Sequence, residues 1–271
     1  MASIRPFWWK SRTCIHTPGY PPMIPDDLSN SNLLTAINGA RLVHLDGRLH
    51  ETALLVAQEA NCRGIPVLID AERKMEGLDD LLSLSSYVVC SAKFPQAWTE
   101  APSVPSALVS LLLRLPNVKF VVVTLGEEGC VMLERGVTEK VQSEETDVDD
   151  LIEILKLKRD GNGNSPTCIS SGVAKLRADG IGVVSGRLFV GTAEKIPPGE
   201  LVDTTGAGDA FIGAILYAVC ANMPPEKMLP FAAQVAAIKC RALGARTGLP
   251  YLTDTRLESF LDFRAQGAAT V

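Results

Sequence analysis

Short, nearly continuous apolar runs recur along the chain from residue 41 onward. Four of them lie at 41–45 (RLVHL), 65–70 (IPVLID), 87–90 (YVVC) and 119–125 (KFVVVTL). Apolar runs of this length, without alternation of polar residues, are typical of strands that are covered on both faces. The pattern therefore predicts a largely parallel sheet that is buried between two layers of helices.

Helical patterns separate these runs. They cover 49–62, 78–84 and 106–115; Gly64 and Pro66 follow the first, and Pro116 follows the last. Glycine and proline at these places are ordinary helix stop signals. Strands and helices that alternate in this way predict right-handed crossovers and an α/β fold.

The pattern changes after Gly126. Residues 129–136 (GCVMLERG) predict a strand antiparallel to the preceding one, so we expect a mixed sheet. Residues 138–187 are the least regular part, with an acidic patch and one helical pattern that ends near Leu157. We interpret this segment as a surface insertion in a single core over 25–271, preceded by an N-terminal arm over 1–24.

The last third of the chain predicts a short strand near 188–190 and three helices. Two of the helices cover about 209–222 and 226–243, and Thr255 with Glu258 forms a capping pair for the third.

Composition and charge exclude several classes of protein. The chain has 271 residues, 46% of them hydrophobic, and a net charge of −5 with interspersed signs, which argues against a nucleic-acid partner. The longest apolar stretch, 211–221, is too short to span a bilayer. The seven cysteines have no metal-ligand spacing, so we expect reduced thiols and a cytoplasmic protein. Because the first acidic residue is Asp26, an organellar targeting segment is an open alternative for the arm.

The strongest chemical signal is the segment 203–211 (DTTGAGDAF), which precedes a long apolar helix. Gly206 and Gly208 allow a tight turn that exposes backbone amides at the positive end of the helix dipole, an arrangement suited to phosphate. Asp209 places a carboxylate at the same point, where it could accept a proton from an attacking hydroxyl. The combination favours phosphoryl transfer.

Other interpretations of this segment remain open from the residues alone. The glycines could form only a tight connection, with Asp209 stabilising the helix dipole. A dinucleotide-binding loop fits poorly, because Phe211 stands at the third glycine position and the motif comes late in the chain. The chain has no GxxxxGK[ST] segment, which excludes a P-loop.

The motif and the helix after it resemble the C-terminal signature of the ribokinase-like (PfkB) carbohydrate kinases. Further matches in the same order are 66–70, 121–129 (VVVTLGEEG) and 231–246 (FAAQVAAIKCRALGAR). Residues 88–91 and 233–240 are similar to the ketohexokinase-like subgroup. The resemblance implies a three-layer α/β/α sandwich with a mainly parallel sheet, and an ATP-dependent transfer of the γ-phosphoryl group to a hydroxyl of a sugar or small polyol.

The resemblance also implies roles for individual residues. Asp209 would be the catalytic base, and Gly206, Ala207 and Gly208 would form the anion hole. Nucleotide contacts would come from five residues: Thr124, Gly126, Ala236, Ala237 and Gly244. Asp203 and Thr205 fall where many members bind a monovalent cation. The implied cofactors are ATP and Mg²⁺, with K⁺ in many members, and pairing of lids implies a homodimer.

Two departures from the family pattern affect these expectations. Ser91 and Phe94 stand where the family has the Asn and Glu that organise magnesium. The strands that carry the family's sugar-binding aspartate do not precede Arg12, and residues 12–23 resemble the return strand of a lid. We therefore expect an N-terminally incomplete fold, with a catalytically impaired nucleotide-binding or interaction protein as the alternative function.

Overall fold

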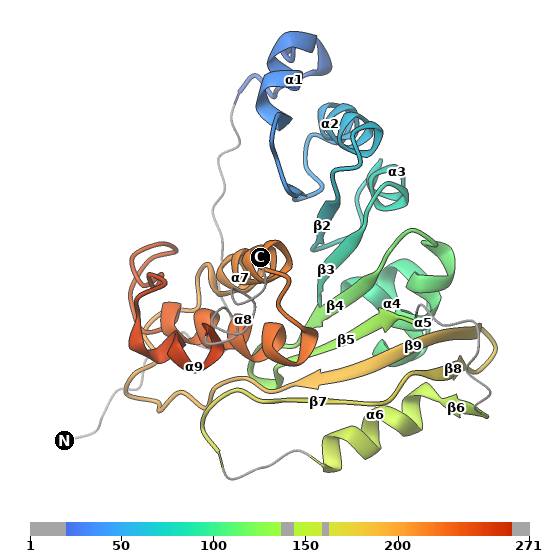
Figure 1. Ribbon diagram of the computed structural model, residues 1–271, viewed down its shortest axis with the longest axis vertical. Coiled ribbons are helices and arrows are strands. Elements are labelled where there is room, and N and C mark those ends of the chain that lie inside the picture. Colours follow the sequence, from blue (N-terminus) through green and yellow to red (C-terminus); the bar gives the residue numbers. More distant parts are fainter. Residues whose placement is uncertain (1–19, 137–143, 159–162, 262–271) are drawn as a thin grey trace, which may run out of the picture.

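The computed structural model describes residues 20–136, 144–158 and 163–261. Residues 1–19, which make up most of the N-terminal arm and lid remnant expected at 1–24, lie outside these ranges. The described chain begins with a 3₁₀ turn, Pro25–Asp27, and helix α1, Asn30–Ile37. Helix α1 lies at the narrow end of the molecule (Figure 1).

Four parallel strands form one half of the sheet and confirm the four apolar runs. They are β1 (Val43–Leu45), β2 (Val67–Ala71), β3 (Tyr87–Ser91) and β4 (Phe120–Thr124). The strands pair in sequence order, with Val43 opposite Val67, Leu68 opposite Tyr87, and Tyr87 opposite Phe120. All four carboxyl ends therefore lie at the same edge of the sheet.

Strand β5, Cys130–Arg135, pairs with β4 in the antiparallel sense, which confirms the mixed sheet. The long strand β9, Gly182–Gly191, then pairs antiparallel with β5. The full order is β1-β2-β3-β4-β5-β9-β8-β6, and β7 also pairs with β9. The remaining strands are β6 (Glu145–Asp147), β7 (Cys168–Ser170) and β8 (Ala174–Ala178).

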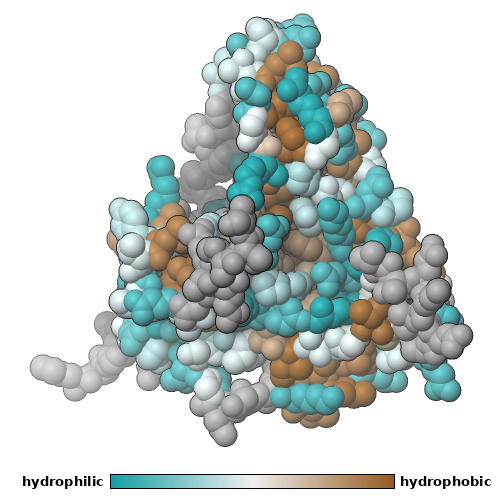
Figure 2. Space-filling model, in the orientation of Figure 1, coloured by the Kyte–Doolittle hydropathy of each residue, from teal (hydrophilic) through white to brown (hydrophobic). Residues whose placement is uncertain are grey.

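The segment 138–187 differs from the surface insertion that we expected. Its described residues supply β6, β7, β8 and the first part of β9 to the main sheet. They also supply helix α6, Val148–Leu157, whose Val148, Ile152 and Leu155 are buried. The opposite side of α6 leaves Ile154 and Leu157 exposed, and hydrophobic surface is visible there at the lower edge of Figure 2. The segment is an integral part of the core.

Two layers of helices cover the sheet and confirm the three-layer sandwich (Figure 1). One face carries α6 together with α2 (His50–Cys62), α3 (Leu78–Ser83), α4 (Phe94–Thr99) and α5 (Val104–Arg114). The other face carries α7 (Ala207–Cys220) and α8 (Pro225–Lys239). Side chains of a strand alternate between these layers, so that Val121 and Val123 face the first layer and Val122 faces the second.

The C-terminal end of the described chain differs in detail from the expectation. Helix α8 ends at Lys239, four residues earlier than the pattern indicated. A 3₁₀ turn, Thr255–Leu257, leads into the short helix α9, Glu258–Leu261, and its cap is Asp254 instead of Thr255. The Asp254 carboxylate accepts the Arg256 amide at 3.0 Å. None of the helices in the described ranges combines the length and the apolar character needed to cross a membrane.

Candidate active site

The candidate site is built on the turn 203–206, which ends where α7 begins. Gly206 precedes the helix with φ at +78°, in the left-handed region. A Cβ at this position would lie 2.8 Å from the carbonyl oxygen of Ala245. Gly206 is thus required both by the backbone conformation and by the close approach of the loop that follows α8.

Asp203 holds the turn together through its carboxylate. Its two oxygens accept the amides of Thr205 and Gly244, each at 2.8 Å. Hydrogen bonds from Thr205, and then from Gly244, stabilise the ionised form and lower the pKa of Asp203 to about 2. One carboxylate therefore fixes the start of α7 against the segment that follows α8.

The turn leaves backbone donors exposed at the start of α7. The Ala207 amide donates to the Thr204 carbonyl at 3.1 Å. The amides of Gly206, Gly208 and Asp209 have no acceptor among the residues that the structure describes. A Cβ at Gly208 would meet no atom within 4 Å, so the space in front of this turn is open. Exposed amides at the positive end of a helix dipole form a site for an anion.

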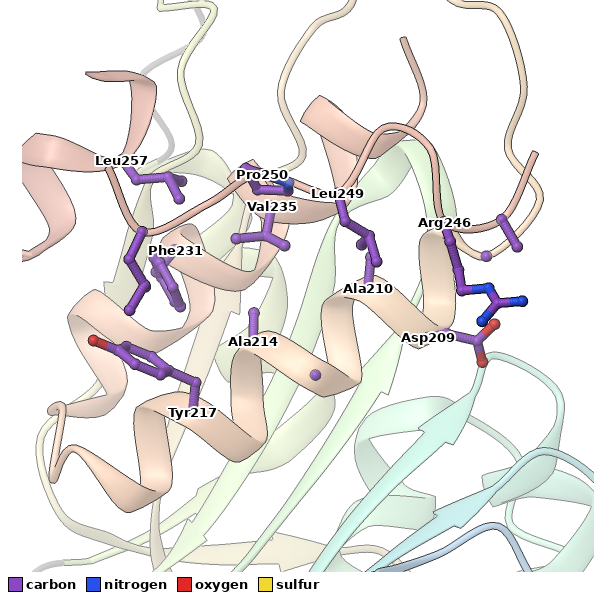
Figure 3. Close-up of a pocket in the computed structure, with 14 residues that line it drawn as sticks. Asp209, Ala210, Ala214, Tyr217, Phe231, Val235, Arg246, Leu249, Pro250 and Leu257 are labelled. Atoms are coloured by element: carbon purple, nitrogen blue, oxygen red, sulfur yellow. The ribbon is translucent and has the colours of Figure 1, made fainter. Parts of the chain in front are cut away.

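Asp209 lies in the first turn of α7 and is exposed. It lines a cavity of about 630 Å³ together with residues of α7, α8 and the loop 245–257. In Figure 3 the Asp209 carboxylate and the Arg246 guanidinium both lie at one end of this cavity, and Tyr217 and Phe231 lie at the other. A charged end and an apolar end thus share one opening.

Polar residues at the ends of β1 and β2 interact electrostatically with Asp209. Burial, and then the charges of Glu72, Asp209 and Asp46, raise the pKa of Asp70 to about 6. Desolvation lowers the pKa of His44, and the charges of Asp46 and Asp209 oppose this shift. Since Val43 and Leu45 pack toward the α2 layer, His44 between them points to the α7 face. The strand ends and the start of α7 therefore carry a group of interacting acidic side chains, the acidic cluster, which we define by Asp70, Glu72 and Asp209.

None of the residues expected to bind the nucleotide lines the cavity, although Ala236 and Gly244 are chain neighbours of its lining residues Val235 and Ala245. Thr124 ends β4, and its hydroxyl donates to the Cys90 carbonyl at 3.3 Å. Gly126 begins the next turn and is exposed. Ala237 on α8 is only 7% exposed, and Ala236 beside it is partly buried. The Gly244 amide instead donates to the Asp203 carboxylate, so one residue expected to bind the nucleotide contacts one of the two residues expected to bind a cation.

The two residues at the family's magnesium positions have structural partners here. The Ser91 hydroxyl donates to the Glu72 carbonyl at 2.7 Å. Phe94 is buried and stacks on Trp98, with ring centroids 6.3 Å apart. No group of three or more metal-ligating side chains is found in the described ranges.

Sequence reasoning found the turn and Asp209 but missed His44, Asp70, Glu72 and Arg246. His44 and Asp70 lie on neighbouring parallel strands, and carboxyl ends of such strands commonly form ligand sites. That rule was the available signal for the strand residues. For Arg246 the signal was weaker: a basic residue two positions after Gly244.

Comparisons with known proteins agree with this geometry. Residues 168–252, which include the turn and Asp209, match the family model "pfkB family carbohydrate kinase". A ribokinase of Mus musculus is 38% identical over 84 residues, which cover 28% of this chain and 26% of that protein. A fructokinase of Salmonella thompson is 43% identical over 63 residues, which cover 21% of this chain and 28% of that protein. The matched segment thus spans roughly a quarter of each relative's length.

Solved structures extend the likeness to most of the chain. The Thermotoga maritima ribokinase has a TM-score of 0.55 and 20% identity, with 87% of this chain and 60% of that chain covered. The Arabidopsis thaliana ribokinase, solved with ribose and ATP, has a TM-score of 0.55 and 21% identity, with 86% and 58% covered. The chain has a ribokinase-like α/β fold, and the segment that carries its candidate site matches the pfkB carbohydrate kinase family.

Proposed function

We propose that this chain transfers the γ-phosphoryl group of ATP to a hydroxyl of a sugar or a related small polyol. One observation carries the proposal: an exposed carboxylate, Asp209, and the open amides of Gly206 and Gly208 share the first turn of α7. The match of residues 168–252 to pfkB carbohydrate kinases supports the same reaction.

In this proposal Asp209 acts as the general base. Its carboxylate accepts the proton of the substrate hydroxyl, whose oxygen then attacks the γ-phosphorus. The bond between this phosphorus and the oxygen that bridges to the β-phosphate breaks, and ADP leaves with that electron pair. The amides at Gly206 and Gly208 bind the oxygens of the group in transfer, where the negative charge is concentrated.

Arg246 is positioned to bind the same group. Figure 3 shows its guanidinium at the same end of the cavity as the Asp209 carboxylate. A guanidinium is always charged and presents paired donors that match phosphate oxygens. Arg246 would therefore hold the phosphoryl group while Asp209 holds the hydroxyl.

The acidic cluster would also bind Mg²⁺ that arrives with ATP. Such an ion takes one or two carboxylates and completes its shell with phosphate oxygens and water, so a cage of three protein ligands is not needed. Asp70 and Glu72 would supply two carboxylates, and a cation beside them would stabilise the ionised form of Asp70, whose pKa is raised by burial and then by the charges of Glu72 and Asp209. Bound Mg²⁺ would neutralise charge on the phosphates. These residues would take over the role that Ser91 and Phe94 cannot fill.

The nucleotide would extend from this point toward the end of β4. Thr124 and Gly126 would contact its phosphates and ribose, and the helix carrying Ala236 and Ala237 would flank the adenine, with Gly244 nearby. The ketohexokinase-like resemblance, the homodimer and the cytoplasmic location stay predictions, as does the N-terminally incomplete fold.

The decisive experiment replaces Asp209 with asparagine. We expect Asp209→Asn to reduce phosphoryl transfer by about 10²–10⁴-fold, the usual contribution of a general base, with ATP affinity nearly unchanged by calorimetry. Asp179→Asn is the matched control, because this carboxylate has 92% of its side-chain surface exposed and pairs with Arg177 on β8.

The outcomes separate the two functions under consideration. Turnover retained in Asp209→Asn would refute the role of this residue. If the unaltered chain binds ATP but transfers no phosphoryl group to any member of a sugar and polyol panel, the alternative of a catalytically impaired nucleotide-binding protein is the correct one.

A further inference from the structure

Lys239 is a fully buried cation that the proposed reaction does not use. It is the last residue of α8, its exposed fraction is 0%, and it is among the largest fully buried side chains. Its ammonium nitrogen donates to the backbone carbonyl of Asp203 at 2.8 Å. No carboxylate of the described chain lies within 4.0 Å of this nitrogen. Burial of a charge without an ion pair is costly, so a buried lysine of this kind needs a specific partner.

The partner that it has, Asp203, is one of the two residues, with Thr205, to which the resemblance assigned a monovalent cation. Such a cation would use the backbone and side-chain oxygens of Asp203. In this structure the carbonyl oxygen accepts from Lys239, and the two carboxylate oxygens accept the amides of Thr205 and Gly244. Each Asp203 oxygen already has a donor. The Lys239 ammonium at the Asp203 carbonyl would also place a second positive charge beside any K⁺ bound to these oxygens, so this donor set does not fit a K⁺ ion at Asp203.

We propose that the Lys239 ammonium serves as the built-in cation of the Asp203 turn, and that it fixes the amides of Gly206 and Gly208 without K⁺. Lys239 is a positioning residue in this scheme, because it acts on the phosphoryl group only through the turn. The effect on transfer rests on the proposed function; the effect on the turn does not.

The backbone beside Lys239 supports this arrangement. The carbonyl of the next residue, Cys240, accepts the amides of Val202 at 2.9 Å and Asp203 at 3.1 Å. A Cβ at Gly248 would lie 2.6 Å from the Lys239 carbonyl, so the following loop closes over this point. The end of α8 thus holds residues 202–203 through hydrogen bonds of the Cys240 carbonyl and of the Lys239 side chain. An ammonium ion and K⁺ carry the same charge, and a lysine supplies it without a binding equilibrium.

The test compares the response of the protein to monovalent cations before and after Lys239 is changed. The variants are Lys239→Ala and Lys239→Met, and Lys239→Arg keeps the charge. Lys227→Met is the matched control, since this partly exposed lysine lies in the first turn of the same helix. Thermal melting, ATP affinity and transfer rate are measured in KCl, ammonium chloride, methylammonium chloride and tetramethylammonium chloride at equal ionic strength.

We expect the unaltered chain and Lys227→Met to be indifferent to the cation, with ATP affinity changing by less than about twofold between salts. Lys239→Ala should melt earlier and bind ATP about tenfold more weakly in tetramethylammonium, as expected for a lost charged hydrogen bond. Ammonium, methylammonium or K⁺ should restore both, because the truncated side chain leaves space for them. Lys239→Met fills that space, so it should lose stability without rescue.

Two results would overturn the proposal: K⁺ raises the melting temperature or ATP affinity of the unaltered chain, or Lys239→Ala responds to cations no differently from Lys227→Met. The response of the unaltered chain to K⁺ tests the proposal even if no Lys239 variant folds. If phosphoryl transfer is never detected, melting and ATP binding still report on the turn. Failure of the proposed function is then distinguishable from failure of this inference.

Discussion

Two aspartates near the start of α7 have opposite environments. Asp203 accepts two backbone amides, and these hydrogen bonds lower its pKa to about 2. Asp70, at the end of β2, is partly buried beside Glu72 and Asp209, and its pKa rises to about 6. Hydrogen bonds within the protein stabilise the ionised form of the first carboxylate, whereas the charge of Arg48 only partly offsets the burial and the repulsion that act on the second.

This difference distinguishes residues that stabilise the fold from residues that would bind a ligand. The Asp203 turn is closed by contacts of the protein with itself, so changes there should damage folding first. The acidic cluster of Asp70, Glu72 and Asp209 concentrates negative charge that a bound cation would offset, so changes there should leave the fold intact or make it more stable. Stability and activity are expected to trade against each other in this cluster.

The largest effect on stability is expected from Gly206→Ala. The left-handed conformation alone costs about 1–2 kcal/mol for a residue with a side chain. The new methyl group would also meet the Ala245 carbonyl oxygen at 2.8 Å. Gly208→Ala is the matched control, because its Cβ would find open space, and alanine favours a helix by up to about 1 kcal/mol. Urea unfolding of both variants tests this; equal losses would contradict the closed turn.

A smaller loss is expected from Asp203→Asn. The asparagine NH₂ group would face an amide that now donates to a carboxylate oxygen, so one hydrogen bond is replaced by contact between two donors. Because the folded pKa of Asp203 is lowered, its contribution is present above about pH 4 and is lost as the pH falls toward 2. The difference in unfolding free energy between variant and parent should therefore shrink between these pH values. A constant difference would show that ionisation of Asp203 is unimportant.

The smallest effect, opposite in sign, is expected from Asp70→Asn. Because the folded pKa of Asp70 is raised, the parent loses stability as the pH rises from about 4 to about 6 and does not regain it above. The variant lacks this loss, so it should melt higher than the parent at about pH 8 and equally near pH 4. MgCl₂ should stabilise the parent more than the variant. A variant that melts lower at the higher pH would mean that Asp70 has a partner in the fold.

Apolar runs in the sequence could predict mainly the strands that are buried along their length. Strands β2 to β4 have continuous apolar runs because helices cover them on both faces, whereas β1 is only partly buried and carries the exposed His44 between Val43 and Leu45. Strands β6 and β7 are three residues long and only partly buried, so they leave no such run. Strand β9 alternates between buried and partly buried residues before its last four residues, which are all buried. Only that last part resembled the other strands, and the segment before it was interpreted as an insertion.

The residues of the candidate site also differ in how far the sequence reveals them. The turn and Asp209 are local in sequence, so the glycine spacing reveals them. Asp70 meets Asp209 only because the crossovers place the end of β2 opposite the start of α7, and no local pattern records this. The burial of Lys239 is equally hidden, since lysine on a helix is ordinarily a surface residue.

The late position of β9 in the chain implies an order in which the parts of the fold form. Its partner β5 ends at Arg135, and β9 begins only at Gly182, so their pairing must close a long loop, whereas β1 to β4 join through shorter crossovers. The turn, Asp209 and Lys239 all follow β9 along the chain. During synthesis the four parallel strands are therefore complete before the residues of the candidate site have been made, and a slow or faulty closure of β9 would leave both the sheet and the candidate site incomplete.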